Sequence, residues 1–204
     1  TITHDLQTIT SNRRTPPWEI ATHTKIKSLL KDNDIEVKTF NASLLWEPWE
    51  ILKDDNTPYK VFSPFYRKGC LKKHAGPREV VAKNDYSFSD KLASSSDIDS
   101  LNLLPKHHWK DKLNKHWKIG EESAMEKYIH FRDNGLTGYK EGRNFPAQEN
   151  VSVLSPHLHF GEISPHQIWF DNKSACPEKD VAHFHSELGW SCLLYTSDAA
   201  DDSL

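Results

Sequence analysis

The 204 residues are enough for one or two domains, and 36% of them are hydrophobic while 27% are charged. The mean hydropathy of −0.72 and the absence of any run of about 18 apolar residues exclude an integral membrane protein. A formal net charge of −3 gives no indication of a nucleic-acid partner. The chain begins Thr1-Ile2-Thr3, with neither a methionine nor a signal sequence, so we expect a segment of a longer protein.

Cysteine and histidine positions give no sign of a disulfide framework or a metal centre. The three cysteines, Cys70, Cys176 and Cys192, are far apart and form no Cys-x-x-Cys pair, which favours a reducing, cytoplasmic location. The histidine pairs 157/159 and 183/185 are spaced two residues apart. Residues at that spacing do not share a helix face, so we expect no metal site.

The first third of the sequence predicts the end of an α/β domain with a parallel sheet. Pro17 begins an amphipathic helix that residues 31–34 end. Its apolar residues recur at helical spacing: Ile20, Ile26, Leu29 and Leu30. Residues 35–40 alternate with period two, as a half-buried strand does. A turn over 54–58 and a second short strand over 59–65 follow.

The rest of the chain predicts an all-α part. A polar run over 94–100 is typical of a linker and places a domain boundary there. After it, Glu121 and Glu122 favour a helix start and Gly135 favours its end. The apolar stripe of this helix consists of Ala124, Tyr128 and Phe131.

Three further helices are predicted in the all-α part. Ser155-Pro156 and Ser164-Pro165 each combine an N-cap serine with a proline at the first helical position. The last helix carries Val181, Phe184, Leu188 and Trp190.

Three groups of residues could carry chemistry, but each also has an ordinary structural interpretation. Residues 150–156 lead into a helix N-terminus, where free N–H groups can bind an anion, although most such positions bind nothing. Arg143, four residues after Tyr139, could hold a phosphate or simply lie on a surface loop. Glu187 and Trp190 share a helix face, so they could contact and stack on a base. Equally, they could be a solvated carboxylate beside a buried ring.

Residues 154–165, LSPHLHFGEISP, closely resemble a hallmark of the DNA photolyase/cryptochrome family. Residues 12–14, 17–19, 44–48 and 58–65 resemble the end of that family's N-terminal antenna domain. The following positions resemble the start of its helical flavin-binding domain: Gly120-Glu121, Tyr139, Arg143, Phe145-Pro146 and 187–190. The resemblance covers about residues 8–190 in the right order.

The resemblance implies a particular division of the chain. Residues 1–65 would be the end of the α/β domain, 66–115 an interdomain linker, and 116–190 the start of the helical FAD-binding domain. After Trp190 the match stops, and residues 191–204 resemble a translated sequencing adapter, so we expect a non-native tail. Without the remaining flavin-domain helices, this segment would bind FAD poorly and would not repair DNA.

The resemblance implies light-driven DNA repair by the parent protein. In such an enzyme, a carbon–carbon lyase, photoexcited reduced FAD gives an electron to a flipped-out cyclobutane pyrimidine dimer, whose ring then splits. Ultraviolet-damaged DNA would be the partner of a monomeric protein without membrane contact. A cryptochrome-type blue-light photoreceptor without repair activity is the alternative.

The resemblance also assigns roles to individual residues. Tyr139 matches a flavin-contacting tyrosine, and Val151, Ser152, Val153, Leu154 and Ser155 match the loop that holds the flavin phosphates. Val151 stands where the family usually has threonine, which removes one side-chain hydroxyl.

Four more positions match the DNA and antenna sites of the family. Arg143 matches a basic residue near the flavin and DNA phosphates, Glu187 a carboxylate that faces the dimer bases, and Trp190 an aromatic residue that stacks on the lesion. Glu19 matches a position that contacts a second, antenna chromophore of the folate or deazaflavin type in some members.

Overall fold

The computed structural model describes residues 6–14, 16–47, 49–73, 97–103, 108–171 and 176–201. Its N-terminal part is a small β-α-β unit. Strands β1 (Thr8–Asn12) and β2 (Glu36–Phe40) pair in parallel, and α1 (Pro17–Lys31) connects them, because parallel strands need a crossover. The strand and helix predicted here are confirmed. The pattern of β1 is too weak to predict a strand, since Ile9 is its only aliphatic residue.

Helix α1 keeps the apolar stripe expected from its sequence but does not bury it. Ile20, Ile26 and Leu29 are 45%, 48% and 61% exposed, and no residue of the helix is buried. The helix ends at Lys31 with Asp32 as its C-cap, as predicted.

The strand predicted over 59–65 is wrong, because this segment turns into a helix. Helix α2 (Phe62–Pro64) is followed by the π-helix η1 (Phe65–Cys70) and by α3 (Leu71–Lys73). Phe62, Phe65 and Tyr66 lie at i, i+3 and i+4, so the helical period outweighs the alternation in the residues before them. Pro64 lies in the first turn, where proline removes no intrahelical hydrogen bond. The preceding turn is confirmed, since the Thr57 N–H donates to Asp55 at 2.9 Å.

The remaining regular elements of the described residues are all helices, which confirms an α/β part followed by an all-α part. The elements are η2 (Ile98–Leu101), α4 (Trp109–His116), α5 (Glu121–Asn134), α6 (Tyr139–Gly142), α7 (Ser155–Phe160), α8 (Pro165–Asp171) and α9 (Glu178–Asp201). Gly135 is the C-cap of α5, as predicted.

Ser164 is confirmed as the cap of α8. Its Oγ accepts the N–H of His166 at 3.2 Å, and its own N–H donates to Gln167 Oε1 at 2.9 Å, which is a reciprocal capping box. The equivalent prediction for Ser155 is wrong. Helix α7 already includes Ser155, its N-cap is Leu154, and no side chain caps it.

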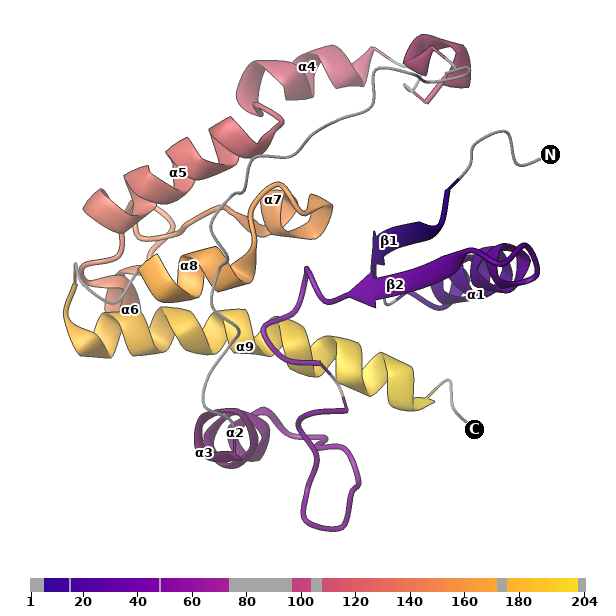
Figure 1. Cartoon of the computed structure of the whole chain (residues 1–204). Helices are drawn as coiled ribbons and strands as arrows, with labels where there is room; N and C mark the ends of the chain where they lie inside the picture. Colours follow the sequence, from indigo (N-terminus) through magenta and orange to yellow (C-terminus); the bar gives the residue numbers. More distant parts are fainter. Residues whose placement is uncertain are drawn as a thin grey trace.

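Helix α9 runs through the middle of the molecule, with α6 and α8 on one side and α2 and α3 on the other (Figure 1). One hydrophobic cluster joins Trp46, Ile51 and Phe65 to residues such as Tyr128 and Phe184. The chain on both sides of the predicted linker therefore shares a core. Positions 94–96 of that linker lie outside the described residues, and the predicted domain boundaries stay predictions.

The segment predicted to be a non-native tail continues α9. Cys192 and Leu193 are buried, 1% and 4% exposed, within the same cluster. Where the native sequence ends remains a prediction, because a helical continuation is compatible with either origin.

Candidate functional site

The short helix α6 is held against α9 by a buried aspartate. Asp180 is 2% exposed and accepts the backbone N–H groups of Gly138 at 3.0 Å and Lys140 at 3.1 Å. These groups belong to the N-terminus of α6, where N–H donors lack partners within the helix and the dipole favours a carboxylate. Burial raises the pKa of Asp180, but the two N–H donors outweigh it and hold that pKa below its usual range. Asp180 therefore fixes α6 as an anion.

A second contact ties the chain that follows α6 to the chain that precedes it. The Asn150 side-chain amide donates to the carbonyls of Gly135 at 2.7 Å and Thr137 at 3.1 Å. Gly142 makes this approach possible, because a Cβ there would lie 2.2 Å from Asn150 Oδ1. The residues on either side of α6 are thus tied together before the loop at 151–155 begins.

Arg143, just after α6, connects this helix to α9. Its guanidinium forms an ion pair with Glu187 and lies over the ring of Tyr139, with Cζ 5.5 Å from the ring centroid. The hydrogen bond to Glu187 raises the pKa of Arg143, and burial raises the pKa of Tyr139. The Arg143 and Glu187 side chains are 30% and 33% exposed. A cation and a carboxylate therefore lie at the surface, against an aromatic wall.

Trp190 lies on α9 one turn beyond Glu187 and is stacked on Phe62 of α2. The two ring centroids are 4.0 Å apart with an interplanar angle of 9°, and Phe62 in turn stacks on Tyr66 at 5.3 Å and 13°. Trp190 nevertheless keeps 40% of its surface exposed. Phe62 therefore packs against the Trp190 ring, and the rest of that ring's exposed surface is accessible to solvent.

The loop before α7 contains an unusual backbone conformation. Val153 has φ +51°, in the left-handed region that β-branched residues rarely adopt. Leu154 is buried, whereas Val151 and Val153 are 50% and 52% exposed and Ser155 is exposed. Leu154 thus anchors the loop in the core while its neighbours remain accessible.

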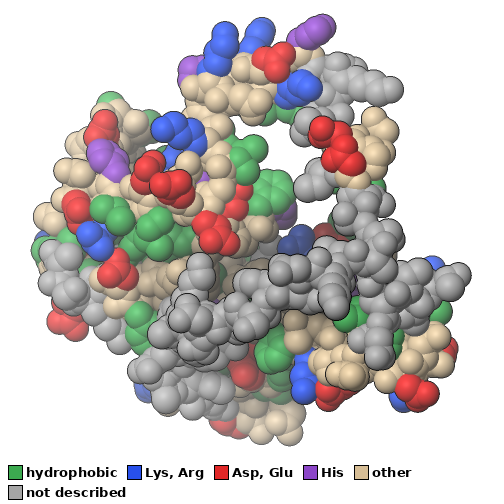
Figure 2. Space-filling model, turned by 45° about the horizontal axis from the view of Figure 1, so that its top comes forward, with side chains coloured by type: hydrophobic (Ala, Val, Ile, Leu, Met, Phe, Trp, Pro, Cys, Tyr) green, Lys and Arg blue, Asp and Glu red, His purple; other side chains and the backbone are tan. Residues whose placement is uncertain are grey.

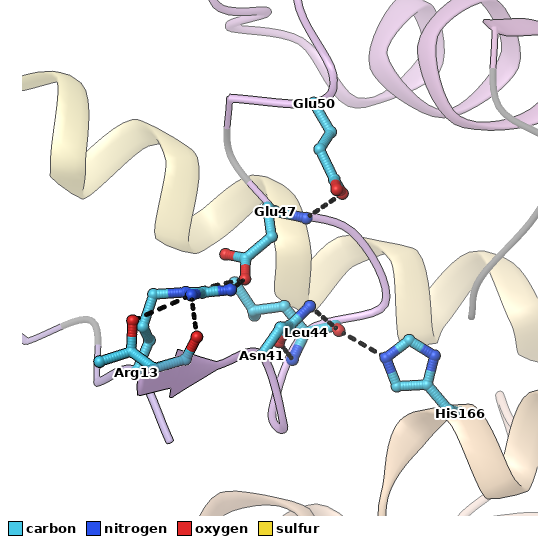
Figure 3. A network of polar contacts seen from close by, with 7 residues as sticks. Arg13, Asn41, Leu44, Glu47, Glu50 and His166 are labelled. Atoms are coloured by element: carbon cyan, nitrogen blue, oxygen red, sulfur yellow. Dashed lines mark hydrogen bonds and ion pairs between the residues drawn. The ribbon is translucent and has the colours of Figure 1, made fainter. Parts of the chain in front are cut away.

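A polar network joins the N-terminal unit to helix α8 (Figure 3). The Arg13 side chain donates to Glu47 at 2.9 Å. The carbonyl of Leu44 accepts from Asn41 Nδ2 at 2.7 Å and from His166 Nε2 at 3.0 Å. Because a carbonyl oxygen can only accept, His166 carries its hydrogen on Nε2. This network fixes the β-α-β unit relative to the helices.

A cavity of about 320 Å³ lies next to this network. Arg13, Arg14, Ser155 and His159 are among the residues that line it, whereas Tyr139 and Glu187 are not. Arg14 also forms an ion pair with Glu19, and its hydrogen bond lowers the pKa of that carboxyl. Arg14 thus pairs with Glu19 of α1 and lines the same cavity as Ser155 of α7.

Three comparisons with known proteins agree with one another. The family model for DNA photolyase matches residues 2–83. A deoxyribodipyrimidine photo-lyase of Agrobacterium fabrum is 35% identical over 92% of this chain and 40% of its own length. The crystal structure of a bacterial class III photolyase from Agrobacterium tumefaciens superposes with a TM-score of 0.75 at 34% identity, over 93% of this chain and 40% of that one.

The chain belongs to the DNA photolyase/cryptochrome family. Cryptochrome-1 of Arabidopsis thaliana is also similar, with 28% identity over 85% of the chain and 27% of its own length. The chain therefore spans about 40% of the length of the photolyases named above.

For a photolyase/cryptochrome chain, the expected site residues fall into two places. Tyr139, Arg143 and Glu187 lie together, and Trp190 follows Glu187 on helix α9. Ser155 instead lines the cavity beside Arg13 and Arg14.

Two residues that contact this candidate site were not predicted, Asp180 and Phe62. The helical spacing of Phe62, Phe65 and Tyr66 would have revealed the α2–η1 segment. No local pattern reveals that Asp180 caps a helix 42 residues away.

Within the described residues, no three His, Cys, Asp or Glu side chains are grouped so that they could hold a metal ion. His157, one of the paired histidines, is instead bonded through Nδ1 to Glu162 at 2.5 Å and stacked on Trp117. None of the described helices combines the length and the apolar character that a membrane span requires.

Proposed function

We propose that the whole protein is a light-driven deoxyribodipyrimidine photo-lyase that splits cyclobutane pyrimidine dimers with FAD as its cofactor. The observation that carries the proposal is the convergence of Arg143 and Glu187 beside an accessible Trp190 on the same helix. This set combines a carboxylate and a stacking ring within one turn of α9 with a cation that follows α6 and is paired with that carboxylate.

Each of these side chains suits one part of a flipped-out dimer. Stacking of a base on an aromatic ring is worth about 1–3 kcal/mol and tolerates any base, which fits Trp190. The carboxylate of Glu187 can accept N–H donors from a base edge. The planar guanidinium of Arg143 can bind phosphate. A dimer already stacks poorly in DNA, so flipping it out costs less than flipping a normal base.

The residues present fit FAD in their donor chemistry. Ser152, in the loop before α7, and Ser155, the first residue of α7, offer hydroxyl donors. Ser155 shares its cavity with the guanidinium groups of Arg13 and Arg14, and hydroxyl and guanidinium donors suit a diphosphate. Tyr139 is packed against Phe131 and Phe184, so it would meet a flavin only with the part of its surface left free. When bound and reduced, FAD supplies the electron for ring splitting, and the protein supplies position and electrostatics.

Two surfaces would serve other parts of the reaction. Basic side chains gather over α4 at the top of Figure 2, where Lys112, Lys115 and His116 are exposed and could contact DNA phosphates. Glu19, paired with Arg14, would lie near an antenna chromophore of the folate or deazaflavin type.

The experiment compares repair of a dimer-containing oligonucleotide in blue light and in darkness, with the whole protein loaded with FAD. We expect repair only in light, and at least about tenfold weaker binding of the dimer for Trp190→Ala. Trp49→Ala, which removes another exposed tryptophan, is the matched control and should leave both unchanged. A protein that binds FAD but leaves dimers intact in light would instead be a cryptochrome-type photoreceptor, the alternative that its similarity to Arabidopsis Cryptochrome-1 supports.

A separate variant tests the phosphate loop. Val151→Thr restores the hydroxyl usual in the family, and we expect it to strengthen FAD binding by a few-fold, since one hydrogen bond is worth about 0.5–1.5 kcal/mol. Val151→Ala is the control for volume alone. Equal FAD affinity in all three proteins would contradict the assignment of this loop.

A further inference from the structure

We propose that Phe62 is a positioning residue for the reaction, because it holds the ring of Trp190 in the orientation that receives a base. This inference rests on the proposed function of Trp190. It concerns a residue of α2, which lies outside the helical segment that carries the other site residues.

The three rings of Trp190, Phe62 and Tyr66 form one aromatic stack. Adjacent centroids are 4.0 Å and 5.3 Å apart, and the interplanar angles are 9° and 13°. Tyr66 is only 8% exposed and makes a further edge contact with Trp46, which is 2% exposed. The stack therefore begins in the buried core and ends at the accessible Trp190.

The backbone of α9 is adapted to this stack. A Cβ added at Gly189 would lie 2.8 Å and 2.9 Å from Tyr66 Cδ2 and Cε2, closer than real Cβ atoms come. Glycine at this position thus allows the Tyr66 ring to pack directly on the helix, one residue before Trp190. Tyr66 also belongs to the π-helix η1, a rare conformation that is frequent at functional sites.

The consequence for binding follows from the side-chain geometry. Phe62 covers one face of the indole, so a base can stack only on the surface that remains exposed. A binding ring that neighbouring side chains already hold in place loses less conformational freedom when the ligand arrives. Phe62 therefore makes Trp190 a fixed stacking surface rather than a mobile surface side chain.

The first test observes the orientation of Trp190 directly and needs no ligand. The chain is labelled with 5-fluorotryptophan, and the ¹⁹F resonance of Trp190 is identified by its loss in Trp190→Phe. We expect Phe62→Leu to move this resonance downfield, because the ring-current shielding of the stacked phenyl ring is lost, and to broaden it. Phe62→Tyr should keep the original shift. An unchanged resonance in Phe62→Leu overturns the proposal, whatever the DNA results.

The second test measures binding of a labelled oligonucleotide with one thymine dimer, beside an undamaged oligonucleotide, by the whole protein. We expect Phe62→Leu to weaken dimer binding roughly three- to ten-fold, Phe62→Tyr to restore it, and Phe40→Leu to have no effect. In a Trp190→Ala background, Phe62→Leu should have no further effect, because Phe62 acts through Trp190.

The outcomes of the second test separate the two proposals. If Trp190→Ala weakens dimer binding but Phe62→Leu does not, the positioning role is wrong and the proposed function stands. If Phe62→Leu weakens binding equally with and without Trp190, its role is structural and the positioning proposal fails. If wild-type protein does not distinguish damaged from undamaged DNA, the proposed function fails, and the ¹⁹F result alone decides the orientation of Trp190.

Should Phe62→Leu unfold the protein, Gly189→Ala provides the second variant. This variant removes none of the three rings, but its added Cβ displaces the ring of Tyr66. We therefore expect it to shift the Trp190 resonance as well. A folded Gly189→Ala protein with the wild-type resonance would overturn the proposal.

Discussion

Asp180 on α9 accepts the backbone N–H of Gly138 at 3.0 Å, across 42 residues of sequence, and thereby caps the helix that carries Tyr139. The helix that bears Glu187 and Trp190 therefore also sets the position of α6. The two parts of the candidate site are coupled through one buried carboxylate.

Asp180→Asn should lower the free energy of unfolding at pH 7 by about 1–3 kcal/mol, because it weakens two hydrogen bonds to a buried group. The pKa of Asp180 lies below its unfolded value of about 3.9, so its charge stabilises the fold above that pH. This contribution is lost as the pH falls through the folded pKa. Urea denaturation between about pH 2 and pH 7 should therefore show a flatter acid profile for the variant. The exposed Glu178→Gln is the control, and a wild-type profile for Asp180→Asn would contradict the capping role.

Arg143 and Glu187 should contribute little to stability, because both side chains are about one-third exposed. A double-mutant cycle with Arg143→Ala and Glu187→Ala should give a coupling energy of about 1 kcal/mol or less in urea denaturation. A coupling well above this value would mean that the pair holds α6 to α9, a role that we assign to Asp180.

Arg13→Ala should be strongly destabilising because it leaves the buried carboxylate of Glu47 without its cation. We expect a loss of about 2–3 kcal/mol in the free energy of unfolding. The double variant Arg13→Ala/Glu47→Gln should recover about 1 kcal/mol, since a neutral amide is less costly to bury. If Arg13→Ala unfolds at the same urea concentration as wild type, the Arg13–Glu47 pair in Figure 3 contributes nothing to stability.

Val153→Gly should stabilise the protein by about 1 kcal/mol. The left-handed backbone costs a β-branched residue about 1–3 kcal/mol, and glycine relieves this at a smaller entropic cost. The control is Val151→Gly, a neighbour of similar exposure without a positive φ, which should destabilise instead. Thermal and urea unfolding measure both variants, and destabilisation by Val153→Gly would contradict the strain.

The three cysteines should differ sharply in reactivity toward a thiol reagent such as DTNB. Burial raises the pKa of Cys70, and it raises the pKa of Cys192 to about 11, so both remain protonated and inaccessible. Cys176 is partly exposed and should react first. Cys176→Ser should remove the fast phase of the DTNB reaction. The thiols of Cys70 and Cys192 should react only when the protein unfolds. Rapid labelling of Cys192 would show that the end of α9 is not packed as described.

Sequence patterns predicted the features of the fold that depend on neighbouring residues. The capping of α8 by Ser164 and the end of α5 at Gly135 are local hydrogen-bonding and backbone effects, and both are confirmed. The period-two segment at 35–40 was likewise sufficient for β2. The strand predicted over 59–65 failed because two periodicities compete there, and packing in the core favoured the helical one.

By itself, the sequence determined which chemical groups the candidate site contains and that Glu187 and Trp190 share a helix face, since both follow from the composition and the helical period. Only the tertiary structure decided what these groups contact. The pairing of Arg143 with Glu187, the capping of α6 by Asp180 and the stacking of Phe62 on Trp190 join segments far apart in the chain. Such contacts depend on how whole helices pack around a common core, and no local spacing of residues encodes that arrangement.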